Sequence, residues 1–177
     1  MPDDGGFERD FVNEINSTTD DENPNYFAYR RKQHRFSSQD LDVLIDSDDS
    51  QYYMGCECKS KQIDVSKADK ENNESEAKLY FSQAFSTDKD GVHQIEKVTK
   101  FLHKTGRKGV LVIAYRRGRG RKVHYYALDW NKVVELFEDD EFSGIPRDVV
   151  KSSGVELFDR KENGKKKDNR FEKVFEV

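Results

Sequence analysis

Leu41-Asp-Val-Leu-Ile45 is followed, after the polar residues 46–50, by Tyr52-Tyr-Met-Gly-Cys-Glu-Cys58. Both stretches are short and largely apolar, as strands are, and the link between them is made of Asp and Ser, which favour turns. The pattern predicts an antiparallel hairpin of two strands. Because the polar residues of the two strands then lie near one another, this hairpin decides both the fold and the place to look for chemistry.

Helices and strands are expected on both sides of this hairpin. The apolar run at residues 110–115 is typical of a strand buried on both faces. A helix between the hairpin and this strand predicts a crossover that leaves the two strands parallel. The sequence thus predicts an α/β fold with a mixed central sheet flanked by helices. The other expected elements are a helix through Phe7, Phe11, Val12 and Ile15, a strand at 26–29, a helix through Val92, Ile95, Val98, Phe101 and Leu102, a strand at 123–130, and a helix through Val133, Val134 and Phe137.

The length of 177 residues suits one main domain. We place this domain at residues 1–153 and a C-terminal extension at residues 154–177. Within the extension, residues 155–158 and 171–177 are expected to form a β-hairpin about Asn163-Gly164, packed on the same domain.

Charge and composition limit the partners. The chain carries 37% charged residues, 12% aromatic residues and a net charge of −4. The aromatic content argues against wholesale disorder. The negative net charge predicts no general attraction to polyanions, so any nucleic-acid binding must come from local basic patches.

The cellular setting is expected to be the cytoplasm, with no membrane association. Residues 1–6 lack the basic and apolar run of a secretory signal, and no window approaches the roughly 20 apolar residues of a membrane span. The two cysteines, Cys56 and Cys58, are best explained as reduced thiols packed in the core.

Asp42, Glu57 and Lys59 carry the chemistry of the hairpin. Side chains alternate along a strand, so Glu57 and Lys59 are expected on one face and the two cysteines on the other. If the hairpin pairs as expected, Asp42 lies beside Glu57. Carboxylate oxygens hold Mg²⁺, which polarises a phosphate and lowers the pKa of a bound water. Lys59 would orient that water and offset developing negative charge, so the set suits metal-assisted phosphodiester cleavage.

Glu8 is a further candidate. It precedes Phe11, Val12 and Ile15 by three, four and seven residues, which places it on the apolar face of the first helix. A carboxylate there needs a partner, and a metal site in the sheet would supply one. The alternative, which Glu8 alone favours, is a position at the edge of the stripe where the helix dipole stabilises a negative charge.

In order and spacing, these residues resemble the PD-(D/E)XK nuclease superfamily and, more narrowly, the archaeal Holliday-junction resolvases. The similarity runs from residue 5 to about residue 154. The matching pieces are Gly5-Gly-Phe-Glu8-Arg9-Asp-Phe11, Tyr29-Arg30-Arg31, Ser37-Ser38, Leu41-Asp42, Glu57-Cys-Lys59, and Gln94-Ile-Glu-Lys-Val98 leading to Gly109-Val-Leu-Val-Ile-Ala-Tyr115. Leu41 stands where the superfamily's name has proline. The turn at 46–50, the polar stretch at 61–76 and the tail at 154–177 also depart from the compact resolvase pattern.

The resemblance implies a restriction-endonuclease-like fold, with the nuclease domain at residues 1–153. It makes Glu8, Asp42 and Glu57 metal ligands for Mg²⁺, with Mn²⁺ as a substitute, and Lys59 the catalytic lysine. It further implies a homodimer that cuts four-way DNA junctions in DNA recombination and repair, by attack of a metal-activated water on phosphorus. The residues that it assigns to DNA contact or support are Arg9, Arg30, Arg31, Ser37 and Ser38.

Two basic clusters independently favour a DNA partner. Residues 30–35 and 116–122 contain no acidic residue, in a chain that is acidic as a whole. Lys and Arg contacts to phosphate dominate non-specific affinity for DNA. An exposed basic hairpin tip is often basic for solubility alone, but two such clusters favour DNA. From the second cluster we expect DNA contacts at Arg116, Arg117, Arg119 and Arg121.

Two rival functions remain open. One is a restriction-type or repair endonuclease on duplex DNA, and the other is a non-catalytic DNA-binding protein with the same fold. The intact Glu57 and Lys59 argue against the second. Several apolar residues end or follow the expected strand at 123–130. They either form the interface of the homodimer or cover the far face of the sheet. These residues are Trp130, Val133, Val134, Phe137 and Phe142.

Overall fold

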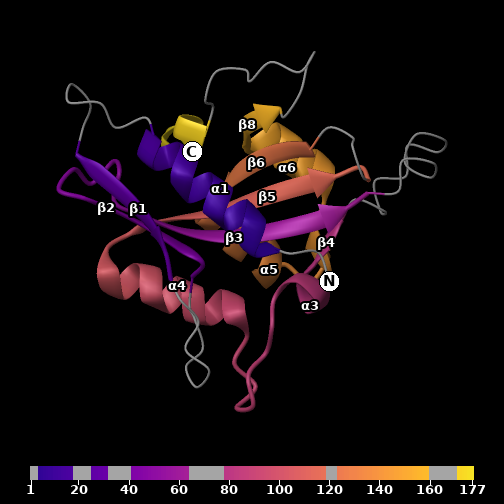
Figure 1. Cartoon of the computed structure of the whole chain (residues 1–177). Coiled ribbons are helices and arrows are strands. Elements are labelled where there is room, and N and C mark those ends of the chain that lie inside the picture. The colour runs from indigo at the N-terminus through magenta and orange to yellow at the C-terminus, as the bar shows by residue number, and fades with distance from the viewer. Residues whose placement is uncertain (1–3, 18–24, 32–40, 64–77, 119–122, 160–170) are drawn as a thin grey trace.

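A six-stranded mixed sheet in the order β1-β2-β3-β5-β6-β8 forms the centre of the protein (Figure 1). The structure is a computed structural model of the chain and describes residues 4–17, 25–31, 41–63, 78–118, 123–159 and 171–177. Among these residues, no helix has the length and apolar character needed to cross a membrane. Ser37, Ser38, Arg119, Arg121 and most of the polar stretch at 61–76 lie outside the described residues.

The elements alternate along the chain much as their apolar patterns predict. The strands are β1 (Tyr26–Arg30), β2 (Val43–Ser47), β3 (Met54–Gln62), β4 (Leu79–Tyr80), β5 (Lys108–Arg116), β6 (Val123–Asp129), β7 (Gly144–Ile145) and β8 (Val155–Asp159). The helices are α1 (Asp4–Ser17), α3 (Phe81–Ala84), α4 (Gln94–Thr105), α5 (Trp130–Glu138), α6 (Arg147–Ser153) and the 3-10 helix η2 (Phe171–Glu176).

The expected hairpin and the expected parallel pair are both confirmed. Strand β2 pairs antiparallel with β3, with Val43 opposite Cys56. Strand β3 runs parallel to β5 along its whole length, from Met54 opposite Lys108 to Gln62 opposite Arg116. Helix α4 makes the connection between them and ends at Gly106, whose φ of 69° is the left-handed conformation that glycine adopts readily. The mixed sheet flanked by helices is therefore confirmed.

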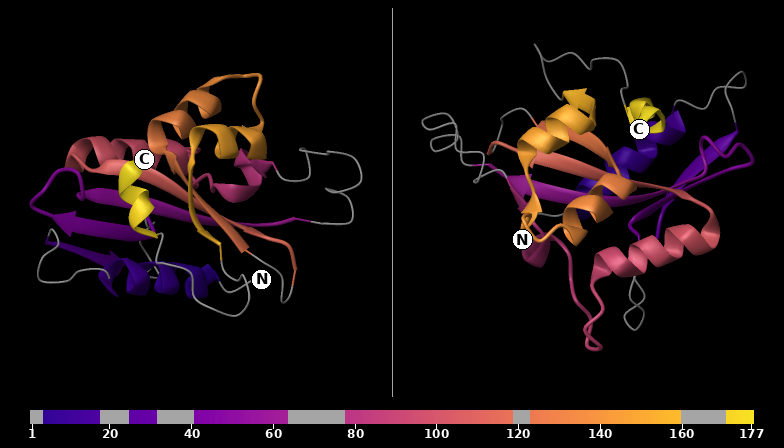
Figure 2. Two further views of the ribbon diagram at one scale, coloured as in Figure 1. Left: turned by 90° about the horizontal axis from the view of Figure 1, so that it is seen from above. Right: turned by 180° about the vertical axis from the view of Figure 1, so that it is seen from behind.

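Two layers of helices cover the sheet. Helix α1 lies on one face and helices α4, α5 and α6 lie on the other, as the left view of Figure 2 shows. On the α1 face, Phe7, Phe11 and Ile15 are buried against inward-facing residues of the strands, including both cysteines. On the opposite face, α4 and α5 bury a second set against Leu111 and Ile113.

The C-terminal segment and α5 correct parts of the sequence interpretation. Strand β8 pairs with β6, but Phe171–Glu176 is a 3-10 helix and not the second arm of a hairpin. The reason is the spacing of Phe171, Val174 and Phe175, which puts all three into the core on the α1 face, whereas a strand would alternate them. Trp130 and Val133 are buried in the other core, so they cover the sheet.

The start of α4 is a smaller correction. Val92 is 36% exposed and precedes the helix, although the apolar pattern placed it in the helical stripe. The helix begins after His93, whose ring nitrogen Nδ1 accepts a hydrogen bond of 3.3 Å from the backbone N–H of Ile95. A side-chain acceptor at this position satisfies a backbone donor that the first turn leaves unpaired, and this sets the boundary.

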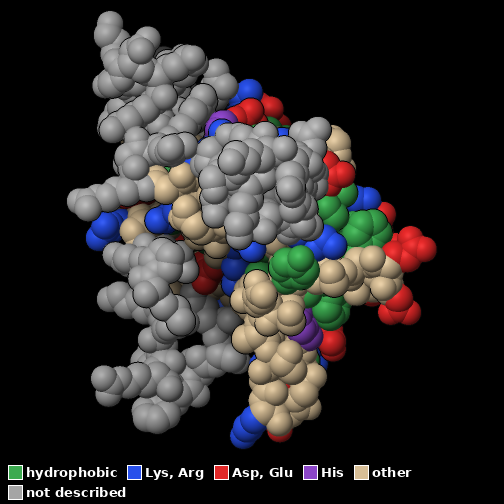
Figure 3. Space-filling model, turned by 90° about the vertical axis from the view of Figure 1, so that its right-hand side faces the viewer, with side chains coloured by type: hydrophobic (Ala, Val, Ile, Leu, Met, Phe, Trp, Pro, Cys, Tyr) green, Lys and Arg blue, Asp and Glu red, His purple; other side chains and the backbone are tan. Residues whose placement is uncertain are grey.

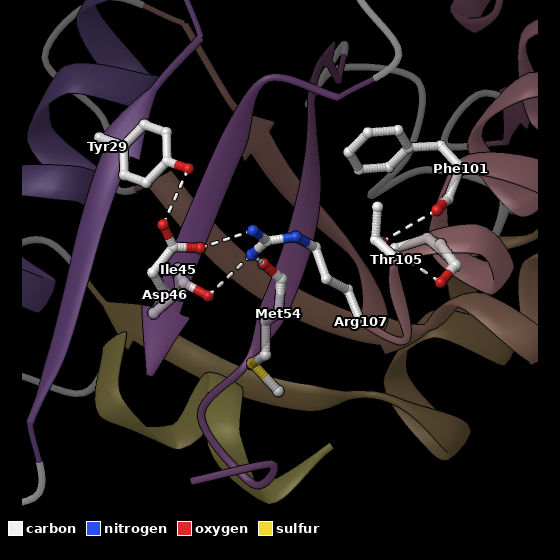
Figure 4. Close-up of polar contacts among 8 residues, drawn as sticks. Tyr29, Ile45, Asp46, Met54, Phe101, Thr105 and Arg107 are labelled. Atoms are coloured by element: carbon white, nitrogen blue, oxygen red, sulfur yellow. Dashed lines mark hydrogen bonds and ion pairs between the residues drawn. The ribbon is translucent and has the colours of Figure 1, made fainter. Parts of the chain in front are cut away.

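Arg107 fastens the far end of the β2–β3 hairpin. Its Nη1 donates to the carbonyl oxygens of Ile45 (3.1 Å) and Met54 (3.2 Å), and its Nη2 binds the Asp46 carboxylate at 2.5 Å (Figure 4). The guanidinium also lies 3.9 Å from the centroid of the Tyr53 ring. One side chain thereby holds both strands in the register that places Asp42 beside Glu57, in the middle of β3.

Candidate active site

Within the described residues, the edge of β3 has no strand beside it beyond the point where β2 stops. Strand β2 pairs with β3 only as far as Val43 opposite Cys56. Asp42 then continues the ladder in part, because its backbone N–H donates to Cys56 O (3.2 Å) and its Oδ2 accepts from the Cys58 N–H (2.8 Å). The carboxylate therefore takes the place of the next strand residue and is fixed at the edge of the sheet.

Glu57 is a buried carboxylate with one satisfied oxygen. The residue is 1% exposed. Its Oε1 receives Lys59 Nζ at 2.6 Å and Gln94 Nε2 at 2.7 Å. Within the described part of the chain, its Oε2 is buried without a hydrogen-bond partner. Burial raises the pKa of Glu57 to about 7, the Lys59 charge lowers it, and the Asp42 charge raises it further.

Lys59 is held in place on two sides. Its ammonium binds Glu57 and lies 5.1 Å from the centroid of the Phe85 ring. Burial alone would lower the pKa of Lys59, but the Glu57 charge and hydrogen bond outweigh it and the pKa is raised. The lysine is therefore a fixed cation, and its side chain remains 19% exposed toward the surface.

A cavity of about 450 Å³ opens beside this edge. It is lined by residues of α1, β3, β4 and α3, among them Glu8, Asp42, Lys59, Lys61, Tyr80 and Gln83. In Figure 1 the end of β3 points to the right, and Figure 3 views the molecule from that side. Lys and Arg side chains lie across the middle of this face, and Asp and Glu side chains gather along one margin of it.

Glu8 lines the cavity and pairs with an arginine. Its Oε2 accepts from Arg30 Nη2 at 2.7 Å and Nε at 2.9 Å. The Glu8 side chain is 15% exposed, and that of Arg30 is 40% exposed. The partner that a carboxylate on this helix face needs is thus Arg30 in this structure. Two predicted site residues on distant elements meet each other here.

The residues only partly resemble a metal site. In the described ranges, no group of three or more His, Cys, Asp or Glu side chains is gathered closely enough to hold a metal ion. The reason is visible in the ion pairs, since Arg30 holds Glu8 and Lys59 holds Glu57. The buried, unpaired Oε2 of Glu57, with the Asp42 charge nearby, nevertheless fits a hard divalent cation.

The cysteines have the role that alternation predicts. Cys56 and Cys58 are free and buried on the α1 face, away from Glu57 and Lys59. Burial raises the pKa of the Cys56 thiol to about 12 and that of Cys58 well above its usual value. Neutral thiols in an apolar core are poor metal ligands, so these residues serve packing.

The basic residues expected to contact DNA fall in different places. Arg9 is exposed on α1, and Arg30 ends β1. Arg31 donates its backbone N–H to Asp42 O (2.9 Å), and its guanidinium lies 5.3 Å from the Phe101 ring centroid. Arg116 ends β5 opposite Gln62, three residues beyond Lys59 on β3, and Arg117 follows it.

Sequence reasoning gave no role to Gln94 or to the wall formed by α3. Gln94 bonds Glu57, and its Oε1 accepts from the Ser86 N–H at 3.3 Å. Its signal in the sequence is a polar residue beside Ile95, at the start of an apolar helical stripe. Tyr80 lies in a strand of two residues and Phe85 follows a helix of four, and such elements are too short for a periodic pattern to reveal.

Comparisons with known proteins bear on the fold. No family model matches the sequence, and no curated protein matches it. Among solved structures, the chain is similar to Archaeoglobus fulgidus Hjc, a Holliday junction resolvase from an archaeal hyperthermophile, with a TM-score of 0.50 and 16% identity over 86% of this chain and 95% of that one. The chain is thus similar in fold to an archaeal Holliday junction resolvase, and the expected likeness in architecture is confirmed at the level of the fold.

Proposed function

We propose that this protein is a metal-dependent DNA endonuclease whose active site contains Asp42, Glu57 and Lys59, with Glu8 beside them. One observation carries the proposal: a buried carboxylate with an unpaired oxygen is held against a fixed ammonium, next to a second carboxylate at an open sheet edge. Burying the Glu57 carboxylate, with Asp42 and Lys59 half-buried beside it, costs stability. Such an arrangement is typical of a site where charge is used in chemistry.

Each residue has a task in phosphodiester hydrolysis. Asp42 and Glu57 would hold Mg²⁺, or Mn²⁺ in its place, through their carboxylate oxygens. The ion would supply Lewis acidity to the phosphate and activate the attacking water. Lys59, fixed by Glu57 and Phe85, orients that water and stabilises the negative charge that develops on the phosphoryl oxygens. Glu8 joins the ligand set when Arg30, which is partly exposed, turns from Glu8 to a DNA phosphate.

Four-way junctions are the proposed substrate. The support is the likeness in fold to a Holliday junction resolvase, together with basic residues near the site on two elements, at Arg30 and Arg31 and at Arg116 and Arg117. A restriction-type or repair endonuclease on duplex DNA is the second candidate, because the same residues serve either substrate. A non-catalytic DNA-binding protein is the third, and the well-ordered Glu57–Lys59 pair argues against it.

A homodimer is part of the proposal. An apolar groove of about 860 Å³ runs between α4 and α5, lined by Ile95, Val134 and Phe137. Lys100 and Lys104 border it on α4, together with Glu96 in the first turn of that helix, and Glu138 borders it on α5. A two-fold axis along the groove would set Lys100 and Lys104 of one copy against Glu138 of the other, so this part of the surface is complementary to itself. Two copies would supply two active sites for the two strands of a junction.

Cleavage of a labelled synthetic four-way junction, beside a linear duplex of matching sequence, tests the proposal. We expect paired nicks in the junction with Mg²⁺ or Mn²⁺, none in EDTA, and none with Lys59→Ala. Equal cutting of junction and duplex would favour the restriction-type candidate. Binding without any cutting, across both metals and both substrates, would leave the non-catalytic candidate.

A further inference from the structure

Arg147 is a buried cation that the proposed active site does not use. Among the described residues, Glu57 and Arg147 are the charged residues that are buried as whole residues, the latter 8% exposed. Glu57 has Lys59 as its partner. In the described part of the chain, by contrast, no carboxylate forms an ion pair with Arg147, and its Nε is buried without a hydrogen bond.

Aromatic rings surround the Arg147 guanidinium. It lies 5.5 Å from the centroid of the Tyr115 ring, and Tyr115 contacts Tyr126 edge to face at 6.0 Å. Burial and the Glu156 charge raise the pKa of Tyr126, while the charges of Arg147 and Arg117 lower it, so both guanidinium groups lie near this phenol. A ring face offsets only part of the cost of burying a cation, which leaves Arg147 in need of an anion.

Glu156 does not fill that need in this structure. Its carboxylate lies 3.4 Å from His124 Nδ1, and its side chain is 47% exposed. It is also a strand residue of β8, on the far side of β6 from β5, whereas Arg147 contacts the β5 residue Tyr115. The guanidinium therefore has aromatic neighbours on one side and no protein counter-charge within ion-pair distance in the described ranges.

The position of Arg147 links it to the candidate active site. Tyr115 pairs in register with Lys61 of β3, so their side chains share a face of the sheet, and Lys61 lines the cavity with Lys59. Neighbouring strands lie roughly 4.8 Å apart. Arg147 is thus connected, through the Tyr115 ring, to the strand position beside Lys61.

Within the described residues, other arginines near this end of the sheet also have a buried guanidinium nitrogen that makes no hydrogen bond, as Arg147 does. Arg31, Arg116 and Arg117 each have a guanidinium nitrogen that is buried without a hydrogen-bond partner in the described structure. Those three were expected to contact DNA from their place in basic clusters, whereas Arg147 stands alone between Pro146 and Asp148.

We propose that Arg147, with Arg117 and Lys61, forms a phosphate-binding site that holds a DNA backbone phosphate beside the one that is cleaved. This inference rests on the proposed function. The fork of the guanidinium suits two phosphate oxygens, and the Tyr115 ring lies 5.5 Å from it. The site would position the strand so that the scissile phosphate reaches Asp42, Glu57 and Lys59.

The test is DNA binding by fluorescence anisotropy in EDTA, over a salt series, with the junction and the linear duplex. The variants are Arg147→Gln, Arg147→Lys and, as a control, Lys151→Gln, which removes an exposed charge from the same helix. Far-UV circular dichroism checks that each variant is folded.

Loss of one phosphate contact should lower the slope of log Kobs against log salt by about 0.9 in Arg147→Gln, for both DNAs. Arg147→Lys keeps the charge but loses the fork, so it should keep the slope and bind more weakly. Lys151→Gln should leave the salt slope and the affinity nearly unchanged. If Arg147→Gln does not fold, Arg147→Lys decides: weaker binding supports the site, and wild-type binding overturns it.

An unchanged slope in folded Arg147→Gln, or an equal change in Lys151→Gln, would also overturn the inference. Parallel cleavage assays with Mg²⁺ separate it from the proposed function. If the wild type cuts DNA and the slope is unchanged, the phosphate site alone is wrong. If the wild type cuts nothing while Arg147→Gln lowers the slope, the phosphate site stands and the nuclease proposal is wrong. No binding of either DNA by the wild type would contradict both.

Discussion

Lys59 Nζ lies 2.6 Å from Glu57 Oε1, and both residues come from the same face of one strand. The i, i+2 spacing brings them to that face, and Gln94 and Phe85 hold them there from the facing helical layer. Glu57 and Lys59 thus hold each other in place through Oε1. In the described residues, Oε2 of Glu57 has no protein hydrogen-bond donor. Several consequences of this pair can be measured.

Replacing Lys59 by alanine should abolish cleavage and preserve DNA binding. The ammonium acts on the attacking water and on the charge of the transition state, so its loss should lower kcat by about 10²–10³. Glu57→Gln should do the same. Lys89→Ala, which removes an exposed lysine outside the cavity, is the control. Single-turnover cleavage and anisotropy measure the two properties, and wild-type turnover by Lys59→Ala would contradict the assignment.

Cleavage at low Mg²⁺ should fall as the pH drops below about 7. Burial raises the pKa of Glu57 from 4.5 to about 7, and a metal ligand must be deprotonated. One pH unit below the pKa leaves about a tenth of the carboxyl ionised, so activity at pH 6 should be roughly tenfold below its plateau. High Mg²⁺ should shift the profile to lower pH, because the ion competes with the proton. A profile that is flat between pH 6 and 8 at low Mg²⁺ would count against Glu57 as a ligand.

The same pKa makes a prediction about stability without metal. The folded-state pKa of Glu57 lies above 4.5, so folding takes up a proton between about pH 4.5 and 7. The stability contributed by this group is fully present below pH 4.5 and is lost as the pH rises through 7. In EDTA, the Tm of the wild type should therefore fall relative to that of Glu57→Gln between pH 5 and 8. A constant difference in Tm across this range would show that the pKa is not raised.

Gln94 should act as a positioning residue for Glu57. Its Nε2 donates to Oε1 at 2.7 Å, and this bond lowers the pKa of the carboxyl. Gln94→Leu should therefore move the pH profile of cleavage to higher pH, in addition to slowing it. Gln51→Leu, which changes an exposed glutamine in the β2–β3 turn outside the cavity and the groove, is the matched control. A slower enzyme with an unmoved profile would indicate a purely structural role for Gln94.

The sequence was sufficient to predict helices and strand faces where the apolar residues follow a helical period or alternate along a strand. Side-chain alternation correctly separated Glu57 and Lys59 from the two cysteines, because it follows from strand geometry alone. The apolar period found α1, α4 and α5. The expected strand at 171–177 is wrong: Phe171, Val174 and Phe175 have helical spacing, but a single apolar triplet is too short to distinguish a helix from a strand. The contacts of Glu8 with Arg30 and of Glu57 with Gln94 join residues 22 and 37 positions apart, and local pattern does not encode such distances.

Arg107 should be the most sensitive point of the hairpin. Its side chain is 8% exposed, binds the Asp46 carboxylate and donates to two carbonyl groups on different strands. Hydrogen bonds with a charged partner contribute about 1.5–3 kcal/mol each, and the bonds of one side chain are not additive, so Arg107→Met should lower the free energy of unfolding by about 3 kcal/mol. Arg107→Lys should lose less. Urea denaturation measures both, and a loss below about 1 kcal/mol in Arg107→Met would contradict the role.

The groove between α4 and α5 should be the dimer interface. Light scattering should give twice the 20.7 kDa mass of the chain. Val134→Arg, which puts a charge into the apolar floor, should produce monomers. Mixing wild-type and Lys59→Ala subunits should yield dimers that nick one strand of a junction, because each subunit would cut one strand.

The polar borders of the groove permit a sharper test of its two-fold symmetry. Lys104→Glu and Glu138→Lys each place like charges in contact across the axis, and each should weaken the dimer. The double variant exchanges the two borders and should restore dimerisation, since every contact then has opposite charges again. Glu141→Lys changes an exposed residue outside the groove and should have no effect. If both single variants weaken the dimer and the double variant does not restore it, Lys104 and Glu138 do not contact each other across the two-fold axis. If the wild type is a monomer and still resolves junctions, the dimer proposal is wrong, and the two strands are cut in two separate binding events.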